Sequence, residues 1–284
     1  MKFFRAIPAA LLLIAGCASE PRHTVARTGD PLADGHAEIA QGPPKDRVLW
    51  EYRTAATAIR RGQFADAKQT LDDALLTLSG VAANDPSARK ARGYFASEAK
   101  KTFRGEPYER VMAYFYRGIL YWVDGEPDNA RACFRNAQFQ DSDAENKEYS
   151  SDYVLLDYLD GLASTKLGAD GSDAYKRSVA LAKAVPAPPP YNPAANVLFF
   201  VELGQGPVKY ATGEYSEELR IHEGNSLARA VQIQVAGQVI RANVYDDLTW
   251  QAMTRGGRIM DHVLANKAVF KRSTDIAGDV GLIG

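Results

Sequence analysis

The side chains that could carry out chemistry are few and scattered along the sequence. Four carboxylates of the C-terminal third, Glu202, Glu214, Glu217 and Asp246, are the candidates for general acid–base catalysis. The four histidines show no HxxxH or HExxH spacing, which argues against a metal site. No G-x-S-x-G sequence supports a serine nucleophile. We therefore expect no catalytic residues, no cofactor and no metal.

Two glycine-containing motifs could in principle bind an anion. Gly204-Gln205-Gly206-Pro207 would need a helix directly after it to direct backbone amides at a phosphate, but another predicted strand follows. A tight strand connection is therefore favoured for this motif. In Arg255-Gly256-Gly257-Arg258, pairing of the arginines with nearby acids such as Asp246, Asp247 and Asp261 is favoured over anion binding.

Cys17 has the most specific sequence context. Lys2 and Arg5 precede an uncharged, largely apolar run at residues 6–16. At about 1.5 Å per residue, a helix of this run is much shorter than the ~30 Å hydrocarbon core of a bilayer. The run therefore predicts a signal peptide and not a membrane span. Ordinary cleavage nearby, with Cys17 left as a plain thiol, is the alternative.

The apolar run ends in Leu13-Ile14-Ala15-Gly16-Cys17, which resembles a bacterial lipobox. The resemblance implies cleavage before Cys17, acylation of that residue and attachment to a membrane by more than one acyl chain, which is sufficient for stable anchoring. No Asp stands at the second position after the cysteine. In proteobacterial lipoproteins this implies sorting to the outer membrane.

Composition indicates a globular chain that forms a core. Of 284 residues, 46% are hydrophobic and 24% are charged. With 34 basic and 35 acidic side chains, no basic excess is available to neutralise phosphates, so a nucleic-acid partner is not expected. Cys133 has no disulfide partner if Cys17 is acylated, and its apolar context predicts a buried, inert thiol.

The spacing of aromatic and small residues between 108 and 140 predicts two packed helices. Gly118 would let the first helix approach the second, where Ala130 is the reciprocal small residue, and Gly125 would turn the chain. This pattern resembles a tetratricopeptide repeat. Its packing positions are Tyr114, Gly118, Tyr121, Ala130, Phe134 and Ala137.

Weaker copies of the pattern turn at Gly62 and Gly168, with a further helix predicted at about 87–103. The first helices of such hairpins line a concave surface, and aromatic and methionine side chains there are typical of protein docking. The register set by Gly118 gives a candidate partner-binding groove of Met112, Phe115, Ile119, Trp122, Val123, Leu155, Tyr158 and Leu162. The sequence does not decide whether this groove is open or covered by other parts of the chain.

The hydropathy period changes from 3.6 to 2 after the proline-rich residues 186–195. Strands are predicted at 196–203, 207–215, 217–222, 231–235 and 239–245, and a helix at about 247–270. The predicted fold is α+β, with N-terminal tetratricopeptide-like helical hairpins followed by a small antiparallel β-unit and a C-terminal helix. The predicted divisions are a signal peptide (1–16), a flexible tether (17–44), a helical domain (45–185), a linker (186–195), a β-unit with terminal helix (196–272) and a Gly-rich tail (273–284).

The C-terminal part adds to the resemblance. The sequence Glu202-Leu203-Gly204-x-Gly206-Pro207-x-Lys209, with Asp246-Asp247 and a terminal helix containing Arg255 and Lys267, is similar to a group of bacterial tetratricopeptide-like envelope lipoproteins without known active-site residues. Genes of this group sometimes neighbour lipoproteins that activate peptidoglycan synthases. The resemblance implies a periplasmic location at the outer membrane and a protein partner in the cell envelope, with the peptidoglycan-synthesis machinery as one such partner.

We therefore expect a lipid-anchored scaffold or adaptor that is not an enzyme. The first alternative is a cell-wall glycan binder or hydrolase whose site would be formed by the four carboxylates of the β-unit. The second is a structural envelope protein that associates with itself.

Overall fold

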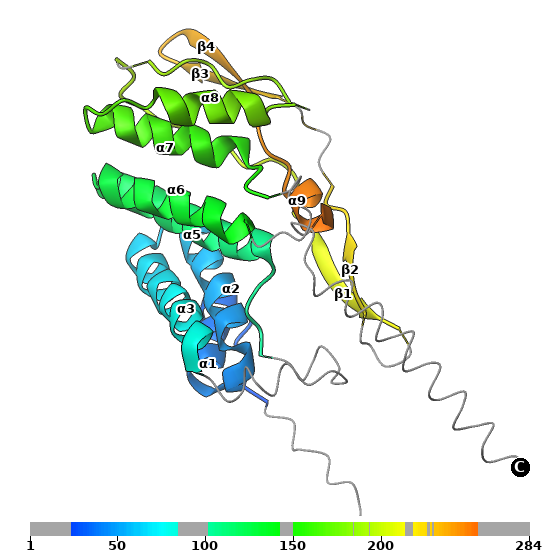
Figure 1. Cartoon of the computed structure of the whole chain (residues 1–284). Coiled ribbons are helices and arrows are strands. Elements are labelled where there is room, and N and C mark those ends of the chain that lie inside the picture. The colour runs from blue at the N-terminus through cyan, green and yellow to red at the C-terminus, as the bar shows by residue number, and fades with distance from the viewer. Residues whose placement is uncertain are drawn as a thin grey trace, which may run out of the picture.

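The computed structural model describes residues 24–84, 102–142, 150–183, 185–192, 194–213, 218–225, 228 and 230–254. The fold is α+β, with helices first and strands after them (Figure 1). The helices are α1 (Pro31–Gln41), the 3-10 helix η1 (Pro44–Asp46), α2 (Arg47–Arg60), α3 (Phe64–Asn84), α5 (Pro107–Val123), α6 (Pro127–Asp141), α7 (Val154–Lys166), α8 (Ser172–Leu181) and α9 (Leu248–Thr254). The strands are β1 (Val208–Thr212), β2 (Glu218–His222), β3 (Ala230–Val235) and β4 (Gln238–Asn243). None of the described helices is long and apolar enough to cross a membrane.

The three predicted helical hairpins are confirmed. They are α2–α3, α5–α6 and α7–α8, and they stack in chain order from the blue to the green end of Figure 1. Each turns at a glycine with positive φ: Gly62 at 69°, Gly125 at 77° and Gly168 at 75°. This backbone conformation is one that side chains with a Cβ rarely adopt, which is why glycine marks all three turns. The helix predicted at 87–103 lies almost entirely outside the described residues.

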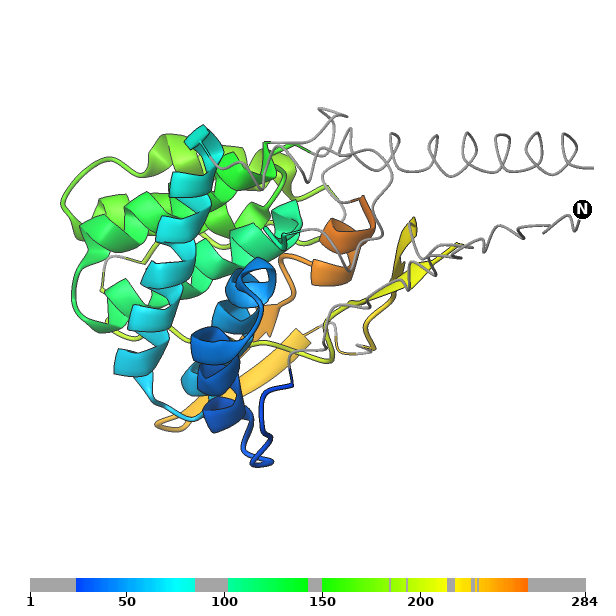
Figure 2. The same cartoon turned by 90° about the horizontal axis from the view of Figure 1, so that it is seen from below.

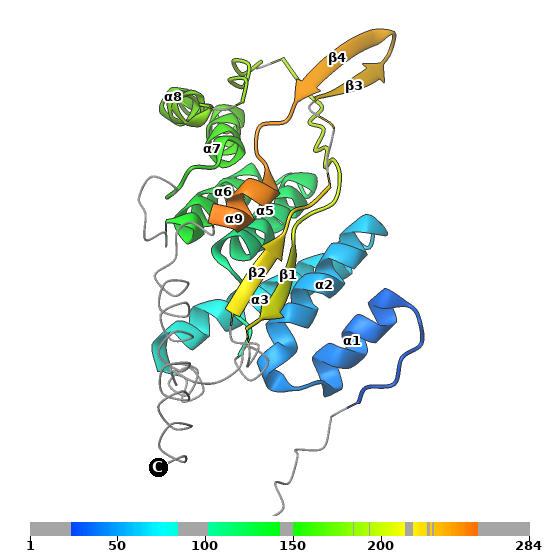
Figure 3. The same ribbon diagram turned by 90° about the vertical axis from the view of Figure 1, so that its right-hand side faces the viewer.

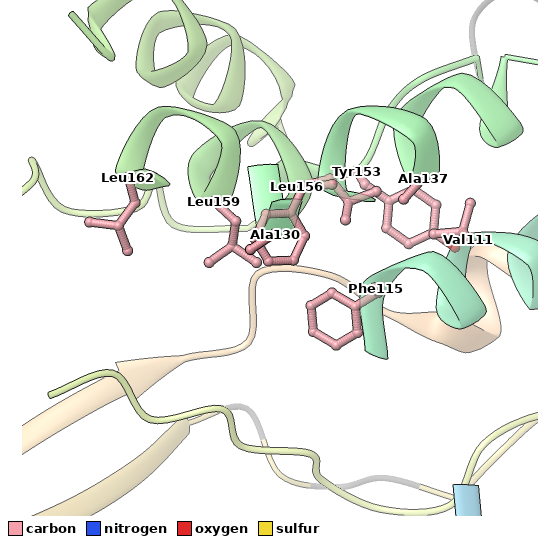
Figure 4. Packing of buried hydrophobic residues seen from close by; sticks show 9 residues of the cluster. Val111, Phe115, Ala130, Ala137, Tyr153, Leu156, Leu159 and Leu162 are labelled. Atoms are coloured by element: carbon pink, nitrogen blue, oxygen red, sulfur yellow. The ribbon is translucent and has the colours of Figure 1, made fainter. Parts of the chain in front are cut away.

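The predicted contact between α5 and α6 is present. A Cβ at Gly118 would lie 2.6 Å from Cε1 of Phe134, so only glycine allows the two helices to approach this closely. Ala130, Phe134 and Ala137 are fully buried, and Tyr114 and Tyr121 pack partly buried against the same cluster. Figure 4 shows how side chains of α5, α6 and α7 converge to form this core.

The prediction of a flexible tether at residues 17–44 is wrong for residues 31–41, which form α1. Asp30 caps this helix by accepting the Leu32 amide at 2.8 Å. The face that α1 buries is largely polar. Asp34 accepts hydrogen bonds from the backbone N–H and hydroxyl of Thr28 at 2.6 and 2.8 Å, and Glu38 pairs with Arg27 at 2.7 Å. The earlier part of the tether, residues 17–23, lies outside the described residues.

The predicted antiparallel strands are confirmed, and in the described residues they form two separate two-stranded sheets. In β1–β2, Val208 lies opposite His222 and Thr212 opposite Glu218; in β3–β4, Val231 lies opposite Ala242. In Figure 3 the β3–β4 hairpin lies far from β1–β2, and Figure 2 shows β1–β2 next to α9. The first residues of the predicted C-terminal helix form α9, and positions after Thr254 lie outside the described part of the chain.

Residues 196–203 are not a strand of either sheet, which corrects the prediction for this segment. They connect α8 to β1, and Leu198 and Phe200 pack against the helices whereas Val197, Phe199 and Val201 are exposed. The preceding proline-rich residues are more than a linker. The Tyr191 ring lies 4.9 Å from that of Tyr158 and 5.4 Å from that of Tyr175, which fixes this stretch to α7 and α8.

Candidate interaction surface

The predicted groove residues lie together along α5 and α7, with one exception. Phe115 and Leu162 are buried in the central cluster, and Met112, Ile119, Trp122, Leu155 and Tyr158 pack partly buried against it. Val123, at the end of α5, is 58% exposed. The register deduced from Gly118 therefore places seven of the eight side chains against one apolar cluster.

This groove is filled by the chain itself. Phe200 contacts Phe115 edge to face with ring centroids 6.0 Å apart, and Leu198 packs against the same cluster. The Tyr191 hydroxyl donates a hydrogen bond to the carbonyl oxygen of Tyr158 at 3.0 Å. An external partner would reach the floor of the groove only by displacing residues 191–200, so partner binding there stays a prediction.

A different recess contains none of the predicted groove residues. Residues of α6, α7 and α8 line a pocket of about 410 Å³, with Phe134, Leu156 and Leu181 as apolar walls. Two residues of its lining are strongly exposed: Phe139 at 69% and the side chain of Arg135 at 63%. The sequence analysis did not find this site, since its residues come from three helices and share no local spacing.

The pocket is charged as well as apolar. Arg177 bridges Asp157 at 3.0 Å and Asp160 at 3.3 Å, and Arg131 contacts Asp160 at 2.9 Å. Arg135 lies 3.8 Å from Asp160 and makes no hydrogen bond with any other described residue. Arg131 is not part of the pocket lining, whose charged residues are Arg135, Arg177, Asp157 and Asp160, so the two positive and two negative groups of the lining balance. Burial raises the pKa of Asp157, against the opposing effect of Arg177.

Asp246 joins the C-terminal segment to the helical hairpins. Its carboxyl group accepts hydrogen bonds from the amides of Val154 at 3.0 Å and Leu155 at 2.7 Å, the first two residues of α7. Tyr153, at the N-cap position of α7, makes no side-chain cap. Asp246 therefore supplies the acceptor that this helix start lacks in its own sequence.

Two further acids lie near this contact. The Asp141 carboxylate accepts the backbone amide of Asp152 at 3.2 Å, and the Gln251 side chain of α9 donates to the Asp152 carboxylate at 2.7 Å. Burial raises the pKa of Asp246 and of Asp141 to about 7, and raises that of Asp152 as well. These acids join the C-terminal segment to α6 and α7. Their burial at this junction is the main cause of their raised pKa values.

Two of the four carboxylates that would form the site of a glycan binder or hydrolase lie in the described residues, and they make separate contacts. Glu202 accepts a hydrogen bond from the Tyr116 hydroxyl, whereas Asp246 caps α7. Glu214 and Glu217 lie outside the described residues, as do Cys17 and the Arg255–Arg258 motif. Gly204 and Gly206 lead into β1, so a strand and not a helix follows them directly.

In the described ranges, the histidines and the cysteine have defined surroundings. No group of three or more His, Cys, Asp and Glu side chains there could hold a metal ion. His36 lies 2.8 Å from Asp66, and the His222 ring stacks on that of Tyr210 at 4.1 Å. Cys133 is buried and free, and burial raises the pKa of its thiol to about 11. It therefore stays protonated at neutral pH.

A scan against protein-family models, a search of curated proteins and a search of solved structures give no match for this chain.

Proposed function

We propose that the protein is a lipoprotein anchored to the outer membrane through Cys17, and that its helical hairpins hold a protein partner in the periplasm. The anchor is supported by the signal-peptide pattern and by the lipobox-like sequence before Cys17. Arg27 is already tied to α1 through Glu38, so only nine residues, 18–26, lie between the anchor and the folded body, a distance of ten residue steps. At about 3.5 Å per extended residue, the body would stay within ~35 Å of the membrane.

The observation that carries the scaffold role is the exposed pair of Arg135 and Phe139 at the mouth of the α6–α8 pocket. Arginine and aromatic side chains beside a recess are the residue types enriched at protein interfaces. Arg135, whose exposed side chain lies 3.8 Å from Asp160, and the neighbouring Phe139 favour a partner segment with an acidic and an apolar side chain. By resemblance to envelope lipoproteins, a component of peptidoglycan synthesis is a partner of this kind.

Site-specific photo-crosslinking in the native envelope tests this assignment. A photoreactive residue would replace Arg135, Phe139 or, as the control, Leu76 of α3, which is 72% exposed and is not part of the pocket lining. We expect the same protein adduct from positions 135 and 139 and none from position 76. Equal adducts from all three positions, or none from any, would remove the pocket as the partner site.

A further inference from the structure

The outward side of α2 carries two basic residues beside a tryptophan. Arg53 and Arg60 stand seven positions apart, which places them on one face of the helix, and both are exposed. Trp50 lies one turn earlier and is partly buried, and the Arg53 guanidinium group lies over its ring, 4.8 Å from the centroid. We call Trp50, Arg53 and Arg60 the α2 face.

The α2 face has an excess of positive charge. The neighbouring Arg61 pairs with Asp30 at 2.7 Å, whereas Arg53 and Arg60 form no ion pair with any residue that the structure describes. Asp46, the N-cap residue of α2, is the acid on this side of the helix. Two arginines against one aspartate leave the face positive.

The chain that leads from Cys17 reaches the body at this face. Arg27 pairs with Glu38 of α1, and its guanidinium group also lies over the Trp50 ring, 4.9 Å from the centroid. Ten residue steps separate Arg27 from Cys17, which is at most about 35 Å of extended chain. Figure 1 shows α1 and α2 at one end of the stacked hairpins, with α7 and α8 at the other. An anchored Cys17 therefore keeps the α2 face within that distance of the membrane.

We infer that the α2 face docks on the anionic phospholipid headgroups of the membrane that holds Cys17. The inference rests on the proposed anchor, and it adds an orientation to the anchored protein. Both residue types of the face suit this surface, since arginine binds phosphate oxygens and tryptophan rings concentrate at the membrane–water interface. The α6–α8 pocket contains no residue of the α2 face, so docking and partner binding use separate surfaces.

A modest attraction is sufficient for docking once the chain is anchored. Two basic residues near an anionic surface together favour the docked over the undocked state about 30-fold. For a free protein this would give only weak binding. The anchor makes the contact intramolecular, so the same attraction determines which face of the body lies on the membrane.

Vesicles that carry the protein on a chemical tether test the inference. The chain from residue 17 onward would be coupled through Cys17 to a maleimide lipid. Cys133 is buried, and burial raises the pKa of its thiol to about 11, so coupling takes place at Cys17. Because this tether replaces acylation, failure to dock would leave the proposed anchor standing. Failure of palmitate labelling in cells would remove the anchor but not the measured affinity of the α2 face for lipid.

Quenching of Trp50 fluorescence reports docking. The vesicles contain phosphatidylcholine and phosphatidylglycerol, both brominated near the glycerol end of the acyl chains, and bromine quenches a tryptophan that touches it. We expect stronger quenching of the parent protein than of Trp50→Phe. Both chains keep Trp122 and Trp250, so the difference belongs to Trp50. Arg53→Glu combined with Arg60→Glu should abolish the difference, and vesicles of brominated phosphatidylcholine alone should reduce it.

The matched control is Lys183→Glu combined with Arg241→Glu. These exposed residues follow α8 and lie in β4, at the opposite end of the molecule from α1 in Figures 1 and 3. The control makes the same change in net charge and should keep the quenching of the parent protein. Parent quenching equal to that of Trp50→Phe, equal quenching on neutral and anionic vesicles, or an equal loss in both charge-reversed pairs would overturn the inference.

Discussion

Replacing Asp246 by alanine should destabilise the protein, and more strongly in mild acid than at alkaline pH. The Asp246 carboxyl group is the acceptor for the amides of Val154 and Leu155 at the start of α7. Alanine would leave both amides without this partner, and Val154 is only 3% exposed, so water cannot easily replace it.

The size of the effect follows from these two hydrogen bonds. Loss of an N-cap acceptor costs about 1 kcal/mol, and a buried amide left without an acceptor costs about 1–3 kcal/mol. We therefore expect Asp246→Ala to lower the free energy of unfolding by about 2–3 kcal/mol near pH 5. Asp246→Asn keeps an acceptor oxygen and should cost less than about 1 kcal/mol at that pH.

The pH dependence follows from the raised pKa of Asp246. Burial raises this pKa from 3.8 to about 7 in the folded state, so the folded protein binds the proton more tightly than the unfolded chain. Between these two values the unfolding free energy therefore falls as pH rises. Asp246→Ala removes this contribution. The difference in unfolding free energy between the variant and the parent protein should therefore shrink toward about pH 8. Asp246→Asn should equal or exceed the parent in stability there.

Urea unfolding of the three chains at about pH 5 and about pH 8 measures these differences. Asp173→Ala is the matched control, because Asp173 lies in the first turn of α8 and its side chain is 86% exposed with one ion pair, to Lys176. That substitution should change the unfolding free energy by less than about 0.5 kcal/mol. If Asp246→Ala unfolds at the same urea concentration as Asp173→Ala, or if its effect grows with pH, the reasoning is refuted.

Three further predictions concern other parts of the chain. Gly118→Ala should destabilise by about 1–3 kcal/mol in urea unfolding because its Cβ would lie 2.6 Å from the Phe134 ring; an unchanged or higher midpoint, the usual result of this substitution inside a helix, would contradict the close contact. Cys133 is 8% exposed with a pKa near 11, so a thiol reagent should label it much more slowly in the native protein than in urea, and rapid native labelling would contradict its burial. Cys17→Ser should abolish incorporation of radiolabelled palmitate in cells, and label retained by the variant would place the acylation elsewhere.

The helical hairpins could be predicted because their determinants are local. Gly62, Gly125 and Gly168 are turn residues, and each lies within a few positions of the helices that it separates. Gly118 and Ala130 are twelve residues apart, and the fit of Phe134 against Gly118 follows from helical geometry alone. Small residues at helical spacing therefore determined both the hairpins and the register of the predicted groove.

Helix α1 was missed for a physical reason. Its buried face carries Asp34 and Glu38, and these carboxylates are satisfied by Thr28 and Arg27. A search for an apolar stripe cannot detect a face that is buried through hydrogen bonds and ion pairs. The signal that was present, an Asp at position 30 followed by Pro31, is the ordinary sequence of a capped helix start.

The covering of the groove could be predicted only in part. The apolar run at residues 196–203 predicts a strand that the structure does not contain, although Leu198 and Phe200 do pack against the helices. Whether an extended segment has a strand beside it depends on residues far away in sequence, or on another chain. The same limit applies to the α6–α8 pocket, where Arg135 and Arg177 meet only after two hairpins have stacked.

The contacts that cross residues 186–195 change the meaning of that predicted boundary. Lys209 pairs with Glu109 at 2.6 Å, Gln251 donates to Asp152 at 2.7 Å, and Asp246 caps α7, so each contact spans about a hundred residues. All three join polar groups, which an analysis of hydrophobic periodicity does not register. Because the start of α7 takes its acceptor from the C-terminal part, the third hairpin is completed by chain that follows the proline-rich segment. The helical and C-terminal parts are therefore energetically coupled, although their hydropathy periods differ.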